Sequence, residues 1–287
     1  MDLQIKHFFD PGTFTLTYVA YDSQSKDAVV VDPVWDFDQA TGKLSTKAME
    51  PVVEFLQAQR LQPYFVLETH AHADHLSSSQ LFKNVFPSVK VAICERITEV
   101  QKTFKAFFNL SDLDATGKDF DVLLKDGQIL EAGSLKIKVL ATPGHTPACV
   151  SYLIGDALFS GDAIFMPDSG TGRCDFPHGS AELLYKSITE RIYTLPDATR
   201  IFVGHDYQPQ GRELRYQTSV AEQKEKNIQL AGHVSEKDFV QFRKQRDSTL
   251  AAPKLLIPSL QVNIRAGHLP PAESNGVSYI KTPLKPQ

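Results

Sequence analysis

The chain has 287 residues, of which 42% are hydrophobic and 22% charged, and its formal net charge is −4. This size suits one large globular domain or two small ones, and the acidic balance provides no basic field for nucleic acid or an anionic membrane. No apolar run approaches the ~18 residues of a spanning helix, and the first residues lack the pattern of a signal peptide.

The N-terminal part is predicted to be rich in β-structure, because its apolar runs alternate or are β-branched. Strands are expected at 5–9, 15–21, 28–33 and 64–67. Asp32-Pro33 ends the third of these, since proline cannot continue a strand. Residues 36–47 are expected to be a polar insertion, 46–59 a helix, and 76–82 the start of another helix.

The middle of the chain alternates between strands and helices. Strands are predicted at 89–93, 135–140 and 200–203, and helices at 97–110 and 180–193. Two hairpins are expected, one around Asp126-Gly127 and one around Gly155-Asp156, because these dipeptides favour tight turns.

The character of the sequence changes after residue 208. Polar-faced helices are predicted at 220–230 and 236–245, followed by a proline-rich tail with an apolar strand at 255–257. We expect residues 208–287 to be an extension packed on a single domain, 1–287. This tail would cover either that domain or a neighbouring subunit, which favours a homodimer.

A cluster of metal-ligand side chains follows the strand at 64–67. Three imidazoles and a carboxylate within six residues are costly to bury unpaired, and a metal ion would supply the compensating charge. His70 and His72 would point about 200° apart on a helix, so a loop at a strand end is expected to present them. Later strands deliver similar Gly-His and Gly-Asp pairs. The candidate ligands are His70, His72, Asp74, His75, His145, Asp162 and His205.

Two halves that each place strands before helices predict an α/β (α+β) fold of two sheets flanked by helices. The motif at 69–75, with Gly144-His145, Gly161-Asp162 and Gly204-His205, resembles the motifs of the metallo-β-lactamase superfamily in type and order. The resemblance implies a four-layer αββα sandwich with a C-terminal extension. It also implies two metal positions, one held by His70, His72 and His145 and one by Asp74, His75 and His205, with Asp162 bridging.

Within that superfamily the sequence is more similar to the persulfide dioxygenases. The similarity lies in 170–176 (Gly-Thr-Gly-Arg-Cys-Asp-Phe), Pro177-His178-Gly179, His205-Asp206-Tyr207 and 258–267. Members of that group use one Fe(II), held by the residues that match His70, His145 and Asp162, and oxidise glutathione persulfide with dioxygen to sulfite. The resemblance implies one Fe(II) per chain and a small thiol persulfide as substrate. The other four candidate ligands would then support the site without binding metal.

A dinuclear hydrolase stays an alternative, because all seven candidate ligands are present. It would be a zinc enzyme of the glyoxalase II (thioester hydrolase) type, with one or two Zn(II) per chain that make hydroxide from water. Against it, the C-terminal region shows no obvious basic-aromatic clamp for glutathione. A β-lactam hydrolase is less favoured, because the second ligand set has no cysteine. A binding module without enzymatic activity is also less favoured, because the ligands of an open metal site are intact.

Residues beside these motifs are candidates for catalysis or substrate binding. Asp74, Arg173 and Tyr207 are predicted to be catalytic, and the latter two also to bind substrate. Arg173 would either grip a substrate carboxylate or pair with Asp175. Tyr207 would either hydrogen-bond a sulfur species or pack.

The three cysteines are widely spaced and form neither a disulfide framework nor a CxxC zinc site, which indicates a reducing, cytoplasmic location. Cys174 is a third candidate for substrate binding, because it lies beside Arg173, although a single thiol is more often inert packing. Cys94 and Cys149 are expected in the core.

Overall fold

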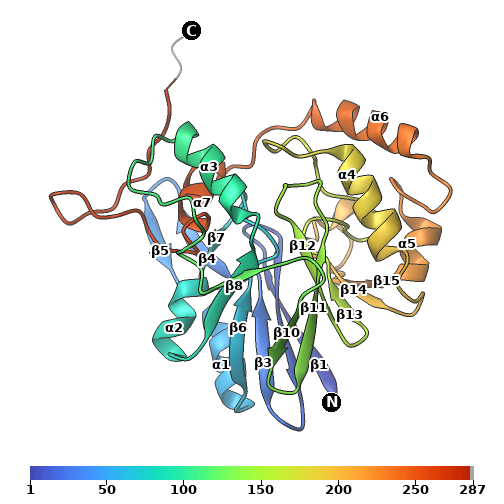
Figure 1. Ribbon diagram of the computed structural model, residues 1–287, viewed down its shortest axis with the longest axis horizontal. Helices are drawn as coiled ribbons and strands as arrows, with labels where there is room; N and C mark the ends of the chain where they lie inside the picture. Colours follow the sequence, from blue (N-terminus) through green and yellow to red (C-terminus); the bar gives the residue numbers. More distant parts are fainter. Residues whose placement is uncertain (285–287) are drawn as a thin grey trace.

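Two six-stranded β-sheets lie at the centre of this computed structural model, which describes residues 1–284 (Figure 1). The first sheet contains, in spatial order, β1 (Leu3–Asp10), β2 (Thr15–Asp22), β3 (Asp27–Val31), β6 (Gln62–Leu67), β8 (Lys90–Cys94) and β9 (Val122–Leu124). The second contains β10 (Ile129–Ala132), β11 (Leu135–Ala141), β12 (Val150–Ile154), β13 (Ala157–Phe159), β14 (Arg200–Phe202) and β15 (Gln217–Ser219). A small third sheet joins β5 (Lys43–Ser45), β4 (Val34–Asp38) and β7 (Leu76–Ser77).

Helices cover the outer face of each large sheet, so the molecule has four layers (Figure 1). Beside the first sheet lie α1 (Glu50–Ala58), α2 (Phe82–Val85), α3 (Ile97–Phe107) and α7 (Leu256–Asn263). Beside the second lie α4 (Ala181–Lys186), which continues as a π-helix over Ser187–Ile192, α5 (Val220–Lys226) and α6 (Glu236–Asp247). The predicted αββα sandwich is confirmed. Within residues 1–284, no helix is long and apolar enough to cross a membrane.

Alternation along the central strands creates two hydrophobic cores. On β2, Leu16 and Tyr18 belong to the core between the sheets, whereas Val19 belongs to the core under the helices. Leu56 of α1 and Phe104 of α3 share that outer core. Since apolar side chains fill both faces of this sheet, the candidate ligands lie beyond the strand ends rather than on a sheet face.

The strands that precede the candidate ligands end at a common edge. β3 and β6 are parallel neighbours with Val31 opposite Leu67, and β13 and β14 are parallel neighbours with Phe159 opposite Phe202. The carboxyl ends of parallel strands meet at the same edge of a sheet. This arrangement brings together loops that are far apart in the sequence.

The hairpin predicted around Asp126-Gly127 is wrong. β9 pairs in parallel with β8 in the first sheet, whereas β10 pairs with β11 in the second. The chain therefore crosses between the sheets at this turn, because a turn dipeptide redirects the backbone without choosing the partners of the flanking strands. The hairpin around Gly155-Asp156 is confirmed, with Ile154 opposite Ala157.

Three other segments also differ from expectation. The insertion at 36–47 folds largely into the β4–β5 hairpin. The helix predicted from residue 76 begins later, because the chain after His75 first enters β7 and only then forms a 3-10 helix over Ser79–Leu81 that leads into α2. The strand predicted at 255–257 is wrong, because Leu256 begins α7. Pro258 lies in the first turn of that helix, where an N–H has no intrahelical partner and proline is tolerated.

Candidate metal centre

His70, His145 and Asp162 converge from three different strand ends and form what we term the three-residue group. One ligand atom of each lies within 4.8 Å of those of the others. His70 Nε2 and His145 Nε2 lie 3.9 Å and 3.6 Å from Asp162 Oδ2. All three side chains belong to buried residues. Two imidazoles and one carboxylate on one face suit a divalent transition metal with open coordination positions.

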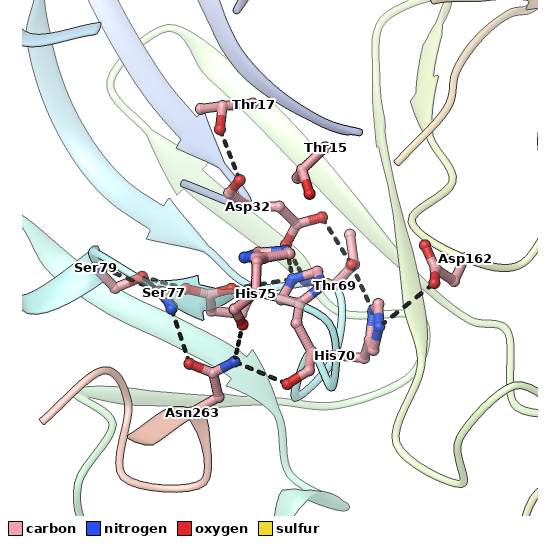
Figure 2. A network of polar contacts seen from close by, with 12 residues as sticks. Thr15, Thr17, Asp32, Thr69, His70, His75, Ser77, Ser79, Asp162 and Asn263 are labelled. Carbon is pink, nitrogen blue, oxygen red and sulfur yellow. Dashed lines mark hydrogen bonds and ion pairs between the residues drawn. The ribbon is translucent and has the colours of Figure 1, made fainter. Parts of the chain in front are cut away.

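Hydrogen bonds hold the imidazole of His70 at Nδ1, the ring nitrogen that does not face Asp162 (Figure 2). Its Nδ1 lies 3.0 Å from Thr69 Oγ1, which itself donates to Asp32 Oδ2 at 2.8 Å. The Thr69 N–H donates to Asp32 Oδ1, also at 2.8 Å. Because the threonine hydroxyl gives its proton to Asp32, it accepts from Nδ1–H of His70, which leaves Nε2 free to bind a metal.

His145 is oriented by a main-chain carbonyl. Its Nδ1 lies 2.7 Å from Arg173 O, so Nδ1–H donates and Nε2 points toward Asp162. The loop that carries Arg173 approaches very closely, since a Cβ at Gly172 would lie 2.0 Å from Asp162 O. Only glycine allows this approach, which explains the glycine-rich sequence of the loop.

His72, Asp74, His75 and His205 form a second cluster, the four-residue group. His205 Nε2 lies 3.2 Å from Asp74 Oδ2 and 3.3 Å from Asp162 Oδ1. Asp162 therefore presents Oδ2 to the three-residue group and Oδ1 to His205. This is the placement that the family resemblance implied for a bridging carboxylate.

His72 lies between the two groups, because its ring centroid is 4.1 Å from that of His70 and 4.2 Å from that of His75. Two buried carboxylates hold its Nε2. His72 Nε2 lies 3.0 Å from Asp32 Oδ1 and 3.3 Å from Glu68 Oε2. These contacts engage Nε2 and leave Nδ1 of His72 without a hydrogen-bond partner among the described residues.

The histidines of the centre differ in their tendency to bind protons. Burial, followed by the charge of neighbouring imidazoles, holds the pKa of His70 well below its ordinary value. Burial and the nearby His72 lower the pKa of His75 to about 4. Burial also opposes protonation of His72, but Asp32 and Glu68 outweigh it and raise the pKa of His72 well above its ordinary value. His70 and His75 are therefore neutral at pH 7, the form that binds metal.

Buried polar atoms without a hydrogen-bond partner in residues 1–284 point into this centre. Each is a nitrogen or oxygen that can ligate a cation, and such atoms are costly to bury alone. They include His70 Nε2, His72 Nδ1 and His75 Nε2. The donor set therefore fits a metal ion.

A cavity of about 1130 Å³ opens onto the metal centre. Asp74, His145 and Asp162 form part of its lining. The β4–β5 hairpin contributes Trp35 and Phe37 to another wall, and the C-terminal extension contributes further residues. The cavity gives a small molecule access to the three-residue group.

The structure brings two of the three predicted substrate-binding residues to this cavity. Tyr207 lines it and stacks on His205, with ring centroids 5.7 Å apart. Arg173 also lines it, but its guanidinium already donates twice to Asp175, at 2.6 Å each. Cys174 does not line the cavity: it is buried, and its N–H donates to Asp247 at 2.8 Å.

Three supporting residues were missed by sequence reasoning. Asp32 was interpreted only as a strand end, and Glu68 was not considered. Asn263, on α7, donates to the main chain of the ligand loop (residues 69–76). Asp32 and Glu68 could have been found as polar residues after apolar runs, and Asn263 lies in the segment 258–267, which was noted only for its family similarity.

Comparison with known proteins gives one family. The sequence profile of the metallo-β-lactamase superfamily matches residues 11–205. Glyoxylase B2 of Dictyostelium discoideum is 47% identical over 283 residues, which cover 98% of this chain and 97% of that protein. The mitochondrial persulfide dioxygenase ETHE1 of Bos taurus is 31% identical over 205 residues, covering 71% and 68%. The crystal structure of ETHE1 from Myxococcus xanthus matches with a TM-score of 0.74 and 30% identity, covering 92% of this chain and all (100%) of that one.

Proposed function

The chain belongs to the metallo-β-lactamase superfamily, and we propose that it is a non-haem iron-dependent persulfide dioxygenase. It would oxidise the persulfide of a low-molecular-weight thiol such as glutathione. The observation that carries the proposal is the separate three-residue group of His70, His145 and Asp162. These two imidazoles and one carboxylate would hold one Fe(II), which would supply open coordination positions for the chemistry of dioxygen with the substrate sulfur.

The proposed reaction consumes one persulfide, one dioxygen and one water. It yields one thiol, one sulfite and two protons, so atoms and charge balance. The S–S bond breaks, and the outer sulfur gives four electrons to dioxygen while it gains three oxygen atoms. The similarity to proteins named persulfide dioxygenase or ETHE1, at 30–31% identity, supports this substrate class.

The contacts of the four-residue group support a single metal. His205 Nε2 lies between Asp74 and Asp162, so a proton there balances carboxylate charge that a second cation would otherwise balance. We propose that these residues orient the three-residue group and keep its electrostatic balance without binding metal.

The lining of the cavity suits an acidic thiol. Lys43, Lys47, Arg246 and Lys254 line it, together with the carboxylates of Asp10, Asp36 and Asp38, and none of the four cations forms an ion pair with another residue of the described chain. Such cations attract the carboxylates of a peptide thiol. Arg173, which is held by Asp175 and donates to Ala251 O at 2.7 Å, would position the loop behind His145 rather than grip the substrate.

A dinuclear zinc thioester hydrolase of the glyoxalase II type is the second candidate. It is favoured by the four-residue group, which has enough donors for its own ion, and by 47% identity to a protein named Glyoxylase B2. In that case the metals would lower the pKa of a bound water and make hydroxide.

Metal content of freshly purified protein, together with two activity assays, tests the proposal. We expect one iron per chain and oxygen uptake on glutathione persulfide, with sulfite and thiol formed in equal amounts. Tightly bound zinc, no oxygen uptake and cleavage of a glutathione thioester would instead establish the hydrolase.

A further inference from the structure

Asn263 links the C-terminal extension to the ligand loop (Figure 2). Its Nδ2 donates to His72 O at 2.8 Å and to His75 O at 2.7 Å, and its Oδ1 accepts from Ser77 N–H at 2.8 Å. The residue is buried. An asparagine amide has two N–H donors and one carbonyl oxygen, and here all three groups bind the backbone between His72 and Ser77.

These bonds fix the loop on both sides of Asp74. His72 and His75 flank the segment that contains this aspartate, so one side chain anchors the backbone that presents three members of the four-residue group. The loop itself has no helix or long strand to hold it, since β7 contains only Leu76–Ser77. Its position therefore depends on contacts from elsewhere in the chain.

Asn263 is itself held firmly in place. Leu260 and Ile264, on either side of it along the chain, belong to the outer hydrophobic core. Gln101 of α3 donates to Ile264 O at 2.8 Å. At Gly267, whose φ is +89°, a Cβ would lie 2.8 Å from Ser77 O, so a second point of the extension touches the end of the loop. Asn263 and Gly267 both lie outside residues 11–205, the part that matches the superfamily profile.

We propose that Asn263 is a positioning residue of the metal centre. Through the carbonyls of His72 and His75 it sets where the ligand loop lies relative to His205 and Asp162. Its loss would leave two buried carbonyls and one N–H unpaired, and the loop would shift to satisfy them. This inference rests on the metal-binding part of the proposed function and does not depend on the substrate.

Two variants of Asn263 and one matched control test the inference. Asn263→Asp keeps the size of the side chain and the acceptor for Ser77 but removes both donors, and Asn263→Ala removes all three bonds. Gln261, on the same helix, is also buried and makes three bonds, to Ile257 O and to the N–H and C=O of Lys281. Gln261→Ala therefore removes as many bonds from α7 without touching the ligand loop.

Co(II) serves as the probe, because its visible absorption reports the geometry of its ligands. The measurements are its dissociation constant by competition with a chelator, its spectrum in the protein, and urea unfolding of each metal-free variant. We expect both Asn263 variants to bind Co(II) about 10–100-fold more weakly and to show an altered spectrum, because loss of a group that orients metal ligands typically has an effect of this size. Gln261→Ala should lower the unfolding midpoint while affinity and spectrum stay those of the wild type.

Two results would overturn the inference while leaving the metal centre intact. One is an Asn263→Asp protein with wild-type affinity and spectrum; the other is a Gln261→Ala protein that loses affinity to the same extent. If Asn263→Ala does not fold, Asn263→Asp alone is compared with the wild type and with Gln261→Ala. A wild-type protein that binds no Co(II) would overturn the metal centre, and this inference with it.

Discussion

His145 donates its Nδ1–H to the main-chain carbonyl of Arg173 at 2.7 Å. This bond fixes the tautomer of the imidazole and aims Nε2 at Asp162. The side chain of Arg173 in turn pairs with Asp175 and donates to Ala251 O, so a charged residue at the cavity wall supports a candidate metal ligand through its backbone.

This relationship predicts how Arg173 acts. Arg173→Met should retain bound metal, because the carbonyl that orients His145 remains, but it should loosen the loop and lower kcat/KM by about tenfold. Asp175→Asn weakens the same pair while leaving the guanidinium in place, so it should lower kcat/KM in a similar way. Steady-state kinetics with glutathione persulfide and metal analysis of both variants check this. A raised KM in Arg173→Met alone would show that the guanidinium binds substrate directly.

Metal stoichiometry separates one metal from two. If only the three-residue group binds iron, Asp74→Ala should keep one metal per chain and lose about 10–100-fold in activity. His145→Ala removes one of three ligands and should abolish bound iron. The wild type and both variants are compared side by side, purified without added metal. Two metals in the wild type, with one lost in Asp74→Ala, would contradict the mononuclear proposal.

Removal of the buried Glu68 carboxylate should be strongly destabilising. It contacts His72 and accepts hydrogen bonds from Ser77 and Ser79. Glu68→Ala would leave these partners unsatisfied and should lower the free energy of unfolding by about 3–5 kcal/mol, as for a broken buried ion pair. Urea unfolding of the metal-free protein measures the change.

Glu99→Ala is the matched control for that experiment. Glu99 pairs with Arg96 at 2.9 Å on the surface of the protein, where such a pair contributes about 0–1 kcal/mol. If Glu68→Ala and Glu99→Ala lowered the free energy of unfolding equally, a special role for the buried carboxylate of Glu68 would be refuted.

The three cysteines should be unreactive in the folded protein. Burial raises the pKa of the Cys94 and Cys174 thiols above the ordinary value and that of Cys149 to about 12. A raised thiol pKa reduces the thiolate fraction at neutral pH, and the thiolate is the reactive form. A thiol reagent should therefore label native protein slowly and label all three cysteines in urea. Rapid labelling of Cys174, with loss of activity, would restore it as a substrate-binding candidate.

Local sequence was sufficient wherever the signal lay within a few neighbouring residues. The ligand motif at 69–75 predicted a loop after a buried strand, because donors two residues apart cannot share an ion on a helix. Gly155-Asp156 predicted the β12–β13 hairpin, because both of its strands adjoin the turn. The order of the four motifs carried the resemblance that implied the αββα sandwich.

Only the tertiary structure decided which distant groups meet. Asp126-Gly127 has the same local chemistry as a hairpin turn, yet its flanking strands join different sheets, because strand partners are chosen by the hydrophobic faces that must be buried. Asp32 contacts the ring of His72 from 40 residues earlier in the sequence. Asn263 reaches His72 O across 191 residues of sequence, since the packing of α7 against the first sheet brings them together. No local sequence pattern predicts this hydrogen bond, because its stability depends on the burial of residues that lie far from both partners in the sequence.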